Sequence, residues 1–268
     1  SSDVCSSDLT VSGRWFLHFA SYFNGFTQMP AVIGLFSVLF LALAAALAVS
    51  LLGIRSRALS ALSGALMAAF PAVGYTFLYL FTASAYCFAI FLAVLSVSLA
   101  RRGRWHWLAG CLLLACSMGT YQAYVTVAIG LSLLVIFRET LDPSASFSAT
   151  LRLGVRLMLF LAAGAVLYYG ILLVFLQVKD LELLSYRGMD AASSGYPFSR
   201  LPGLLLDTYK QVAAFFFLPG SANTFTSGWM AVLDLAALAL GGGCFLLCMG
   251  QEGLWRARWR PLGGLAML

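Results

Sequence analysis

Charged residues are scarce in this sequence, and their scarcity excludes a soluble globular domain. Only 10% of the 268 residues are Asp, Glu, Lys or Arg, whereas 62% are hydrophobic. A soluble domain typically carries about 25% charged residues, which it needs to cover its surface in water. A surface this apolar fits hydrocarbon as its solvent, so the sequence predicts an all-α, polytopic integral membrane protein.

Motifs of known catalytic and metal sites are also missing. The sequence contains no HExxH, no P-loop, no GxSxG and no cluster of metal ligands, and its two histidines, His18 and His106, are far apart. No disulfide framework is expected, because five of the six cysteines lie inside apolar runs, where Cys behaves as a small hydrophobe: Cys87, Cys111, Cys116, Cys244 and Cys248. The residues alone therefore indicate no reaction.

The net charge of +6 does not indicate nucleic-acid binding, because most arginines stand in short clusters between apolar runs. That placement follows the positive-inside rule, which puts Lys and Arg on the cytoplasmic side of a membrane. The predicted cytoplasmic face carries Arg55, Arg57, Arg101, Arg102, Arg104, Arg138, Arg152, Arg156, Arg256, Arg258 and Arg260. The predicted periplasmic face carries Arg14, Lys179, Arg187, Arg200 and Lys210.

The apolar runs predict about seven transmembrane helices and the start of another. As one helix, the uncharged run 58–100 would measure about 64 Å, twice the hydrocarbon thickness, so it must turn, and Pro71 and Gly74 mark the place. If the run 105–137 forms a hairpin of two short helices that turns near 117–122, more of the Lys and Arg residues lie on one face of the membrane, as the positive-inside rule predicts. We therefore expect this hairpin. The remaining crossings are expected at 31–53, 157–176 and 229–250.

Three further boundaries complete the predicted organisation. Residues 1–9 look like one reading frame of a sequencing adapter, so we expect them to be an artefact. Residues 10–268 are then expected to form a single transmembrane domain that belongs to a longer chain at both ends. Residues 178–228 are expected to form a periplasmic loop, in which 204–217 suits a helix lying flat in the membrane interface.

The predicted outer face holds most of the unusual polar residues. Arg14 and Trp15 either bind a phosphate and stack on a sugar, or simply anchor a helix entrance at the headgroup level. Tyr121 and Gln122, at the turn of the hairpin, either bond a neighbouring helix or touch a substrate hydroxyl. Both interpretations of each pair remain open from the sequence.

Two further polar groups lie later in the chain. Tyr186 and Arg187 precede Asp190 in SYRGMD, where Arg187 either pairs with the aspartate on the loop or binds a phosphate. Asp234 lies just inside the last predicted crossing. A carboxylate there is a functional candidate, although its shallow depth also lets it reach interfacial water.

The order of the motifs resembles the bacterial serotype-converting, O-antigen-modifying glucosyltransferase family. The resemblance covers about residues 13–190 and rests on short motifs whose order and spacing match. These motifs are GRWFLHF (13–19), FLYLFTASAY (77–86), GTYQAYVTVA (119–128), YYGILLVFLQ (168–177) and LSYRGMD (184–190).

The resemblance implies transfer of a hexose, often glucose, from a polyprenyl phosphate to a periplasmic glycan such as O-antigen, at the bacterial inner membrane. It implies that Arg14, Tyr121, Gln122, Tyr186 and Arg187 contact the donor or the acceptor. The family's catalytic acid is expected upstream of Gly13, where the adapter-like residues stand, and an acid found in some relatives near Ser84 is also missing. No cofactor is implied with certainty, and a divalent metal is left open.

Two other classes of function compete with this interpretation. A transporter or flippase of lipid-linked glycans would typically show broken helices, paired ionisable groups at the midplane and internal symmetry. Here the one acid in a predicted crossing is shallow and no repeat is visible, which disfavours transport. A non-catalytic membrane scaffold also stays open.

Overall fold

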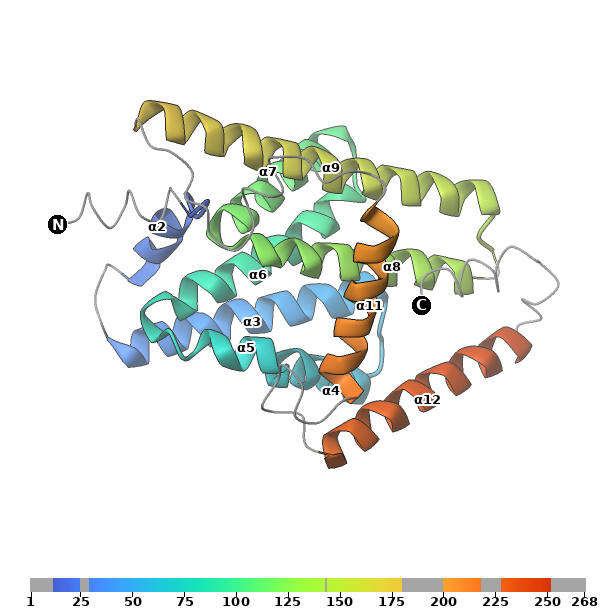
Figure 1. The fold of residues 1–268 in the computed structure, drawn as a ribbon. Coiled ribbons are helices and arrows are strands. Elements are labelled where there is room, and N and C mark those ends of the chain that lie inside the picture. The colour runs from blue at the N-terminus through green and yellow to red at the C-terminus, as the bar shows by residue number, and fades with distance from the viewer. Residues whose placement is uncertain (1–11, 25–28, 143, 180–199, 218–227, 252–268) are drawn as a thin grey trace. The chain divides into compact units, whose positions relative to one another are not determined.

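The computed structural model is all-helical over the residues it describes, which are 12–24, 29–142, 144–179, 200–217 and 228–251. The chain divides into two units, residues 1–184 with 267–268 and residues 185–266. The first unit contains α2 (Leu17–Ala20), η1 (Ser21–Asn24), α3 (Pro30–Leu52), α4 (Arg57–Ala69), α5 (Pro71–Thr76), α6 (Leu80–Ala100), α7 (Arg104–Thr120), η2 (Gln122–Tyr124), α8 (Val125–Leu141) and α9 (Phe147–Val178). The second contains α11 (Leu201–Phe217) and α12 (Gly228–Gln251), and Figure 1 labels these α-helices.

Among the described residues, four stretches are long and apolar enough to cross a membrane: Pro30–Leu52, Leu80–Ala100, Gln122–Leu141 and Phe147–Val178. A 21-residue helix extends over about 31 Å, the thickness of the hydrocarbon core. These helices make the chain a membrane protein, as its composition predicts. The predicted number of seven crossings is not confirmed, because α4 has only 13 residues and α7 has 17, fewer than the about 20 that a crossing needs.

Both predicted turns are present. The helix of residues 57–69 ends before Pro71, which opens α5 at a position that needs no backbone N–H. The run 105–137 forms two short helices, since α7 ends at Thr120 and Tyr121 adopts an extended conformation (φ −157°) before η2 and α8. The hairpin predicted from the balance of arginines is therefore confirmed.

Helix α6 is the central helix of the first unit. In its most apolar stretch 67% of the residues are buried, against 28% in each of the other three candidate spans. It packs against α3, α7 and α8, and Figure 1 shows α3, α6 and α8 running beside one another. A methyl group on Gly110 of α7 would lie 2.8 Å from the Ser96 carbonyl oxygen of α6, so a small residue lets the two backbones approach closely.

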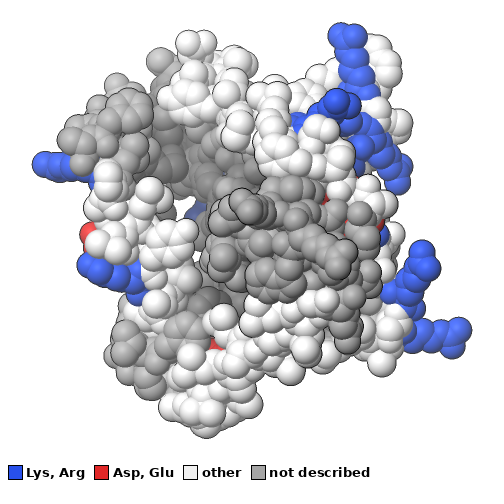
Figure 2. All heavy atoms as spheres, turned by 90° about the vertical axis from the view of Figure 1, so that its right-hand side faces the viewer, with Lys and Arg blue, Asp and Glu red and all other residues white. Residues whose placement is uncertain are grey.

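Arginines from separate helices meet at one end of the first unit. The Arg101 and Arg138 guanidinium groups both donate to the Leu51 carbonyl oxygen, at 3.5 and 3.0 Å, and so cap the C-terminus of α3. Arg156 donates to the carbonyl oxygen of Arg102. We call this the arginine-rich end. Figure 2 turns the right-hand side of Figure 1 toward the viewer and draws the Lys and Arg side chains in blue.

The second unit adds two helices. Helix α12 covers the crossing expected at 229–250, and its Asp234 is half-buried. Helix α11 occupies 17 residues of the segment 178–228, which is therefore partly helical. Lys210 and Asp207 of α11 lie 3.5 Å apart on an exposed face, where an ion pair contributes little to stability.

Candidate functional site

Four of the predicted site residues, Arg14, Trp15, Tyr121 and Gln122, lie together at the end of the first unit opposite the arginine-rich end. Helices α7 and α8 meet there at Tyr121, and the C-terminal half of α9 reaches the same place. Residues 12–20 pack onto this end, where the Phe16 N–H donates to the Gly119 carbonyl oxygen at 2.8 Å. We call this the aromatic end. It comprises Ser12–Phe16, Tyr86, Gly119–Tyr124, Tyr168 and Phe175.

Gln122 and Tyr168 hold the start of this segment. The Gln122 amide nitrogen donates to the Ser12 carbonyl oxygen at 3.0 Å and to the Tyr168 hydroxyl at 3.1 Å. The Tyr168 hydroxyl donates in turn to the Gly13 carbonyl oxygen, also at 3.1 Å. Both amide hydrogens of Gln122 are used in this way. The bond to Tyr168 of α9 is a bond to a neighbouring helix, the first of the two interpretations left open for Gln122. The bond to Ser12 also positions the segment that bears Arg14.

Arg14 lies over a group of tyrosines. Its guanidinium carbon is 5.1 Å from the centroid of the Tyr121 ring, a distance at which a cation is attracted to an aromatic face. Tyr121, Tyr124 and Tyr86 surround one another, with ring centroids 5.4–6.2 Å apart. Since these rings come from η2, its preceding turn and α6, the fold assembles an aromatic surface beneath the cation.

Trp15 is more buried than an interfacial anchor. Only 8% of it is exposed, and its indole stacks on Phe175 of α9 with ring centroids 5.7 Å apart and planes 16° apart. The Phe16 ring lies edge-on to the indole at 5.6 Å. Trp15 therefore fastens residues 12–16 to α9.

Two buried N–H donors at this end have no partner. Among the described residues, neither Nε of Arg14 nor Nε1 of Trp15 has a hydrogen-bond acceptor. A buried donor left unpaired costs about 1–3 kcal/mol, so such groups in native structures usually mark a place where water or a ligand binds. Two neighbouring donors, one of them charged, suit a ligand rich in acceptor oxygens, such as a phosphate.

Several candidate residues are not part of this group. Tyr186 and Arg187 lie outside the described residues. Ser84, the position where some relatives carry an acid, is buried on α6. The described carboxylates of the first unit, Glu139 and Asp142, are at the C-terminal end of α8, about 25 Å along the helix from its start. No group of three or more His, Cys, Asp or Glu that suits a metal ion occurs within the described ranges.

Two contributors from α9 were not predicted individually. Tyr168 and Phe175 both belong to YYGILLVFLQ, one of the motifs that carry the family resemblance, but nothing in the motif distinguishes a site residue from a lipid-facing one. A usable signal was their spacing. Residues seven apart lie on the same face of a helix, and a tyrosine and a phenylalanine on one face suit an aromatic contact.

Replacing Tyr168 with phenylalanine is expected to lower the midpoint of thermal unfolding in detergent. The change removes one hydroxyl and leaves the Gly13 carbonyl and one Gln122 hydrogen unpaired, at a cost of about 1–3 kcal/mol. Tyr169→Phe is the matched control, because Tyr169 is 47% exposed. Equal midpoints for the two variants would show that the hydrogen bonds of Tyr168 do not hold residues 12–13.

Comparison with known proteins identifies the family. The family model described as "Glucosyl transferase GtrII" matches residues 3–250. No curated protein and no solved structure matches the chain. The family match confirms the resemblance to serotype-converting glucosyltransferases. Because it spans most of the 268 residues, the chain belongs to the glucosyl transferase GtrII family, which implies glycosyltransferase activity.

Proposed function

We propose that the protein transfers a hexose, with glucose as the first candidate, from a polyprenyl-phosphate donor to a cell-envelope glycan such as O-antigen. The observation that carries this proposal is the pair of unpaired buried donors on Arg14 and Trp15 beside the tyrosine surface. Family membership supplies glycosyl transfer, and these donors favour a phosphate-bearing sugar as the substrate.

Arg14 binds the donor phosphate in this proposal. A guanidinium forms two parallel hydrogen bonds to phosphate oxygens more readily than an ammonium group does. Tyr121 supports the cation from below, while Gln122 and Tyr168 hold the backbone of Ser12 and Gly13 next to it. The phosphate would therefore meet a cation already held in place, which lowers the cost of ordering on binding.

The tyrosine surface suits the sugar. The rings of Tyr86, Tyr121 and Tyr124 form an aromatic surface for the C–H side of a pyranose, and the Tyr86 and Tyr121 hydroxyls could bond its edge. We assign Tyr186 and Arg187 to the same substrate because they belong to a motif of the family resemblance. Arg187 would add a second cation for the phosphate.

The reaction needs a base as well as a cation. An acceptor hydroxyl attacks the anomeric carbon of the hexose, the bond from that carbon to the phosphate oxygen breaks, and the polyprenyl phosphate leaves with the electron pair. A carboxylate takes the hydroxyl proton, and the arginines stabilise the negative charge on the departing phosphate. We place this carboxylate upstream of Gly13.

The orientation in the membrane follows from charge. Under the positive-inside rule the arginine-rich end faces the cytoplasm of a bacterial inner membrane, so the aromatic end faces the periplasm. A polyprenyl donor anchored in the bilayer and a glycan dissolved in the periplasm would meet at this end. Holding both reactants at one surface supplies part of the rate enhancement.

The test is transfer by the full-length protein in proteoliposomes from a radiolabelled polyprenyl-phosphate glucose. We expect Arg14→Ala to lower transfer about tenfold, equivalent to about 1.4 kcal/mol of barrier, and Arg14→Lys to retain part of the activity because it keeps the charge. Arg55→Ala, which removes an exposed arginine at the other end, is expected to leave the rate unchanged.

Three outcomes would contradict the proposal. A wild-type rate for Arg14→Ala would remove Arg14 from the phosphate site. Transfer from a nucleotide sugar but not from the polyprenyl donor would overturn the donor class. Movement of a fluorescent lipid-linked sugar between leaflets without any glycosyl transfer would favour the flippase.

A further inference from the structure

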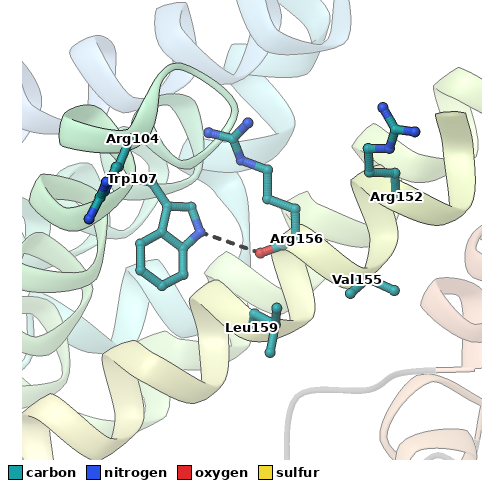
Figure 3. A pocket seen from close by; sticks show the side chains of 6 residues that line it. All are labelled: Arg104, Trp107, Arg152, Val155, Arg156 and Leu159. Atoms are coloured by element: carbon teal, nitrogen blue, oxygen red, sulfur yellow. Dashed lines mark hydrogen bonds between the residues drawn. The ribbon is translucent and has the colours of Figure 1, made fainter.

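The arginine-rich end contains a cavity, separate from the aromatic end. A cavity of about 450 Å³ lies between the N-terminal parts of α7 and α9. Its lining, drawn in Figure 3, consists of Arg104, Trp107, Arg152, Val155, Arg156 and Leu159. We call it the basic groove. Three of its six lining residues are arginines, and no acid is among them.

The charge of the basic groove is uncompensated. Arg152 and Arg156 are one helical turn apart on α9, where like charges repel each other. Among the described residues, no carboxylate lies within salt-bridge distance of Arg104, Arg152 or Arg156. The ion pair that the described residues do form joins Lys210 and Asp207 of α11. A bound anion would remove this repulsion.

Two hydrogen bonds join the elements that line the groove. The Trp107 indole N–H of α7 donates to the Arg156 carbonyl oxygen of α9 at 3.5 Å, the bond drawn as a dashed line in Figure 3. The Arg156 guanidinium donates to the Arg102 carbonyl oxygen, in the turn between α6 and α7. Two contacts thus fix α9 against the α6–α7 connection, with the groove between them.

The apolar half of the groove identifies the class of ligand. Val155 is 43% exposed and Leu159 is 55% exposed, and they alternate with Arg152 and Arg156 along α9. Trp105, at the start of α7, is 78% exposed, as expected of a residue anchored at the headgroup level. A free phosphate would use only the guanidinium groups, whereas an amphiphile would use both halves.

We infer that the basic groove binds an anionic phospholipid of the leaflet at the arginine-rich end. Its headgroup lies among Arg104, Arg152 and Arg156, which line the groove, and an acyl chain runs along Val155 and Leu159. Basic pockets between transmembrane helices are known to hold such headgroups. The lipid would join α7 to α9, the two helices whose other ends form the aromatic end, without taking part in the reaction.

The test compares two double variants of the full chain that remove the same charge. Arg104→Gln/Arg152→Gln removes two exposed arginines from the groove and spares Arg156, whose side chain bonds Arg102. Arg55→Gln/Arg57→Gln removes two exposed arginines at the same end but outside the groove. Binding of phosphatidylglycerol, cardiolipin and phosphatidylcholine is measured by native mass spectrometry, and unfolding midpoints in phosphatidylcholine confirm that both variants fold.

We expect the groove variant to bind phosphatidylglycerol and cardiolipin at least about tenfold more weakly than wild type. The Arg55/Arg57 variant should bind them as wild type does, and phosphatidylcholine should bind weakly throughout. Equal losses in the two variants would show diffuse surface charge and overturn the site. Displacement of the lipid by equimolar inorganic phosphate would assign the arginines to a free anion, which also overturns it.

Discussion

Replacing Gly13 with alanine is expected to lower glycosyl transfer about a hundredfold, equivalent to about 2.7 kcal/mol of barrier. Gly13 has a φ of +78°, a conformation that costs an L-residue about 1–2 kcal/mol. A methyl group there would also lie 2.7 Å from the Tyr168 hydroxyl and collide with the Gln122 amide nitrogen. The substitution therefore breaks the contacts that hold Arg14, and the rate of transfer from the polyprenyl donor measures the loss.

The matched control is Gly130→Ala in α8. Outside the backbone of α8 itself, no heavy atom of the described residues lies within 4 Å of the position that its methyl group would take, and alanine favours a helix over glycine by about 1 kcal/mol. Its transfer rate should equal that of wild type, and its unfolding midpoint should not fall. A Gly13→Ala protein with wild-type transfer would show that the site does not need residues 12–15 in their observed positions.

Replacing Gly119 with alanine is expected to have the second largest effect, lowering transfer about thirtyfold, or by about 2 kcal/mol of barrier. The new methyl group would lie 2.6 Å from Cε2 of Trp15 and 3.0 Å from Cβ of Phe16. Overpacking of this kind typically costs 1–3 kcal/mol. Because Phe16 also bonds the Gly119 carbonyl, the whole segment 12–16 would shift away from α7.

A second substitution separates this clash from a general loss of folding. Trp15→Phe shortens the ring, so in the Gly119→Ala background it should restore part of the lost unfolding midpoint, although it lowers the midpoint of the wild-type protein. Such coupling is measured as a double-mutant cycle. Gly170→Ala, with no atom within 4 Å of its methyl position, is the control on α9. Additive effects of the two substitutions would contradict a contact between Trp15 and Gly119.

The positions of the turns were predictable because the bilayer limits the length of a helix. An uncharged run of 43 residues cannot cross once, and the chain does turn between Ala69 and Leu80. The hairpin of α7 and α8 was predictable from charge, since it brings Arg138 to the same end as Arg101. In the structure both guanidinium groups donate to the Leu51 carbonyl oxygen.

The lengths of individual helices were less predictable. Helix α9 begins at Phe147, ten residues before the apolar run that marked it, with Ser146 as its N-cap. A helix satisfies its own backbone hydrogen bonds and continues into the headgroup region at little cost, so hydropathy does not mark its start. Conversely, Pro71 limits α4 to 13 residues, too few to span alone.

Four candidate residues could be singled out from the sequence, but their contacts could not. Arg14 and Trp15 stood out as polar and aromatic groups on the predicted outer face, and Tyr121 and Gln122 because unpaired polar groups are costly at their depth. Each had a functional and a structural interpretation, and the fold distributes these roles within the group. Gln122 and Trp15 hold the backbone, while Arg14 lies over Tyr121 with its Nε unpaired.

By itself the sequence determined the solvent of this protein, the approximate turns of its chain and the grouping of its arginines, because each depends on composition within one segment. Only the tertiary structure decided that Tyr168 binds Gly13, 155 residues earlier, and that Phe175 covers Trp15. In lipid every apolar face of a helix is equally well solvated, so the choice of facing side chains rests on close packing and hydrogen bonds between distant helices. Local hydropathy therefore does not predict which side chains face each other.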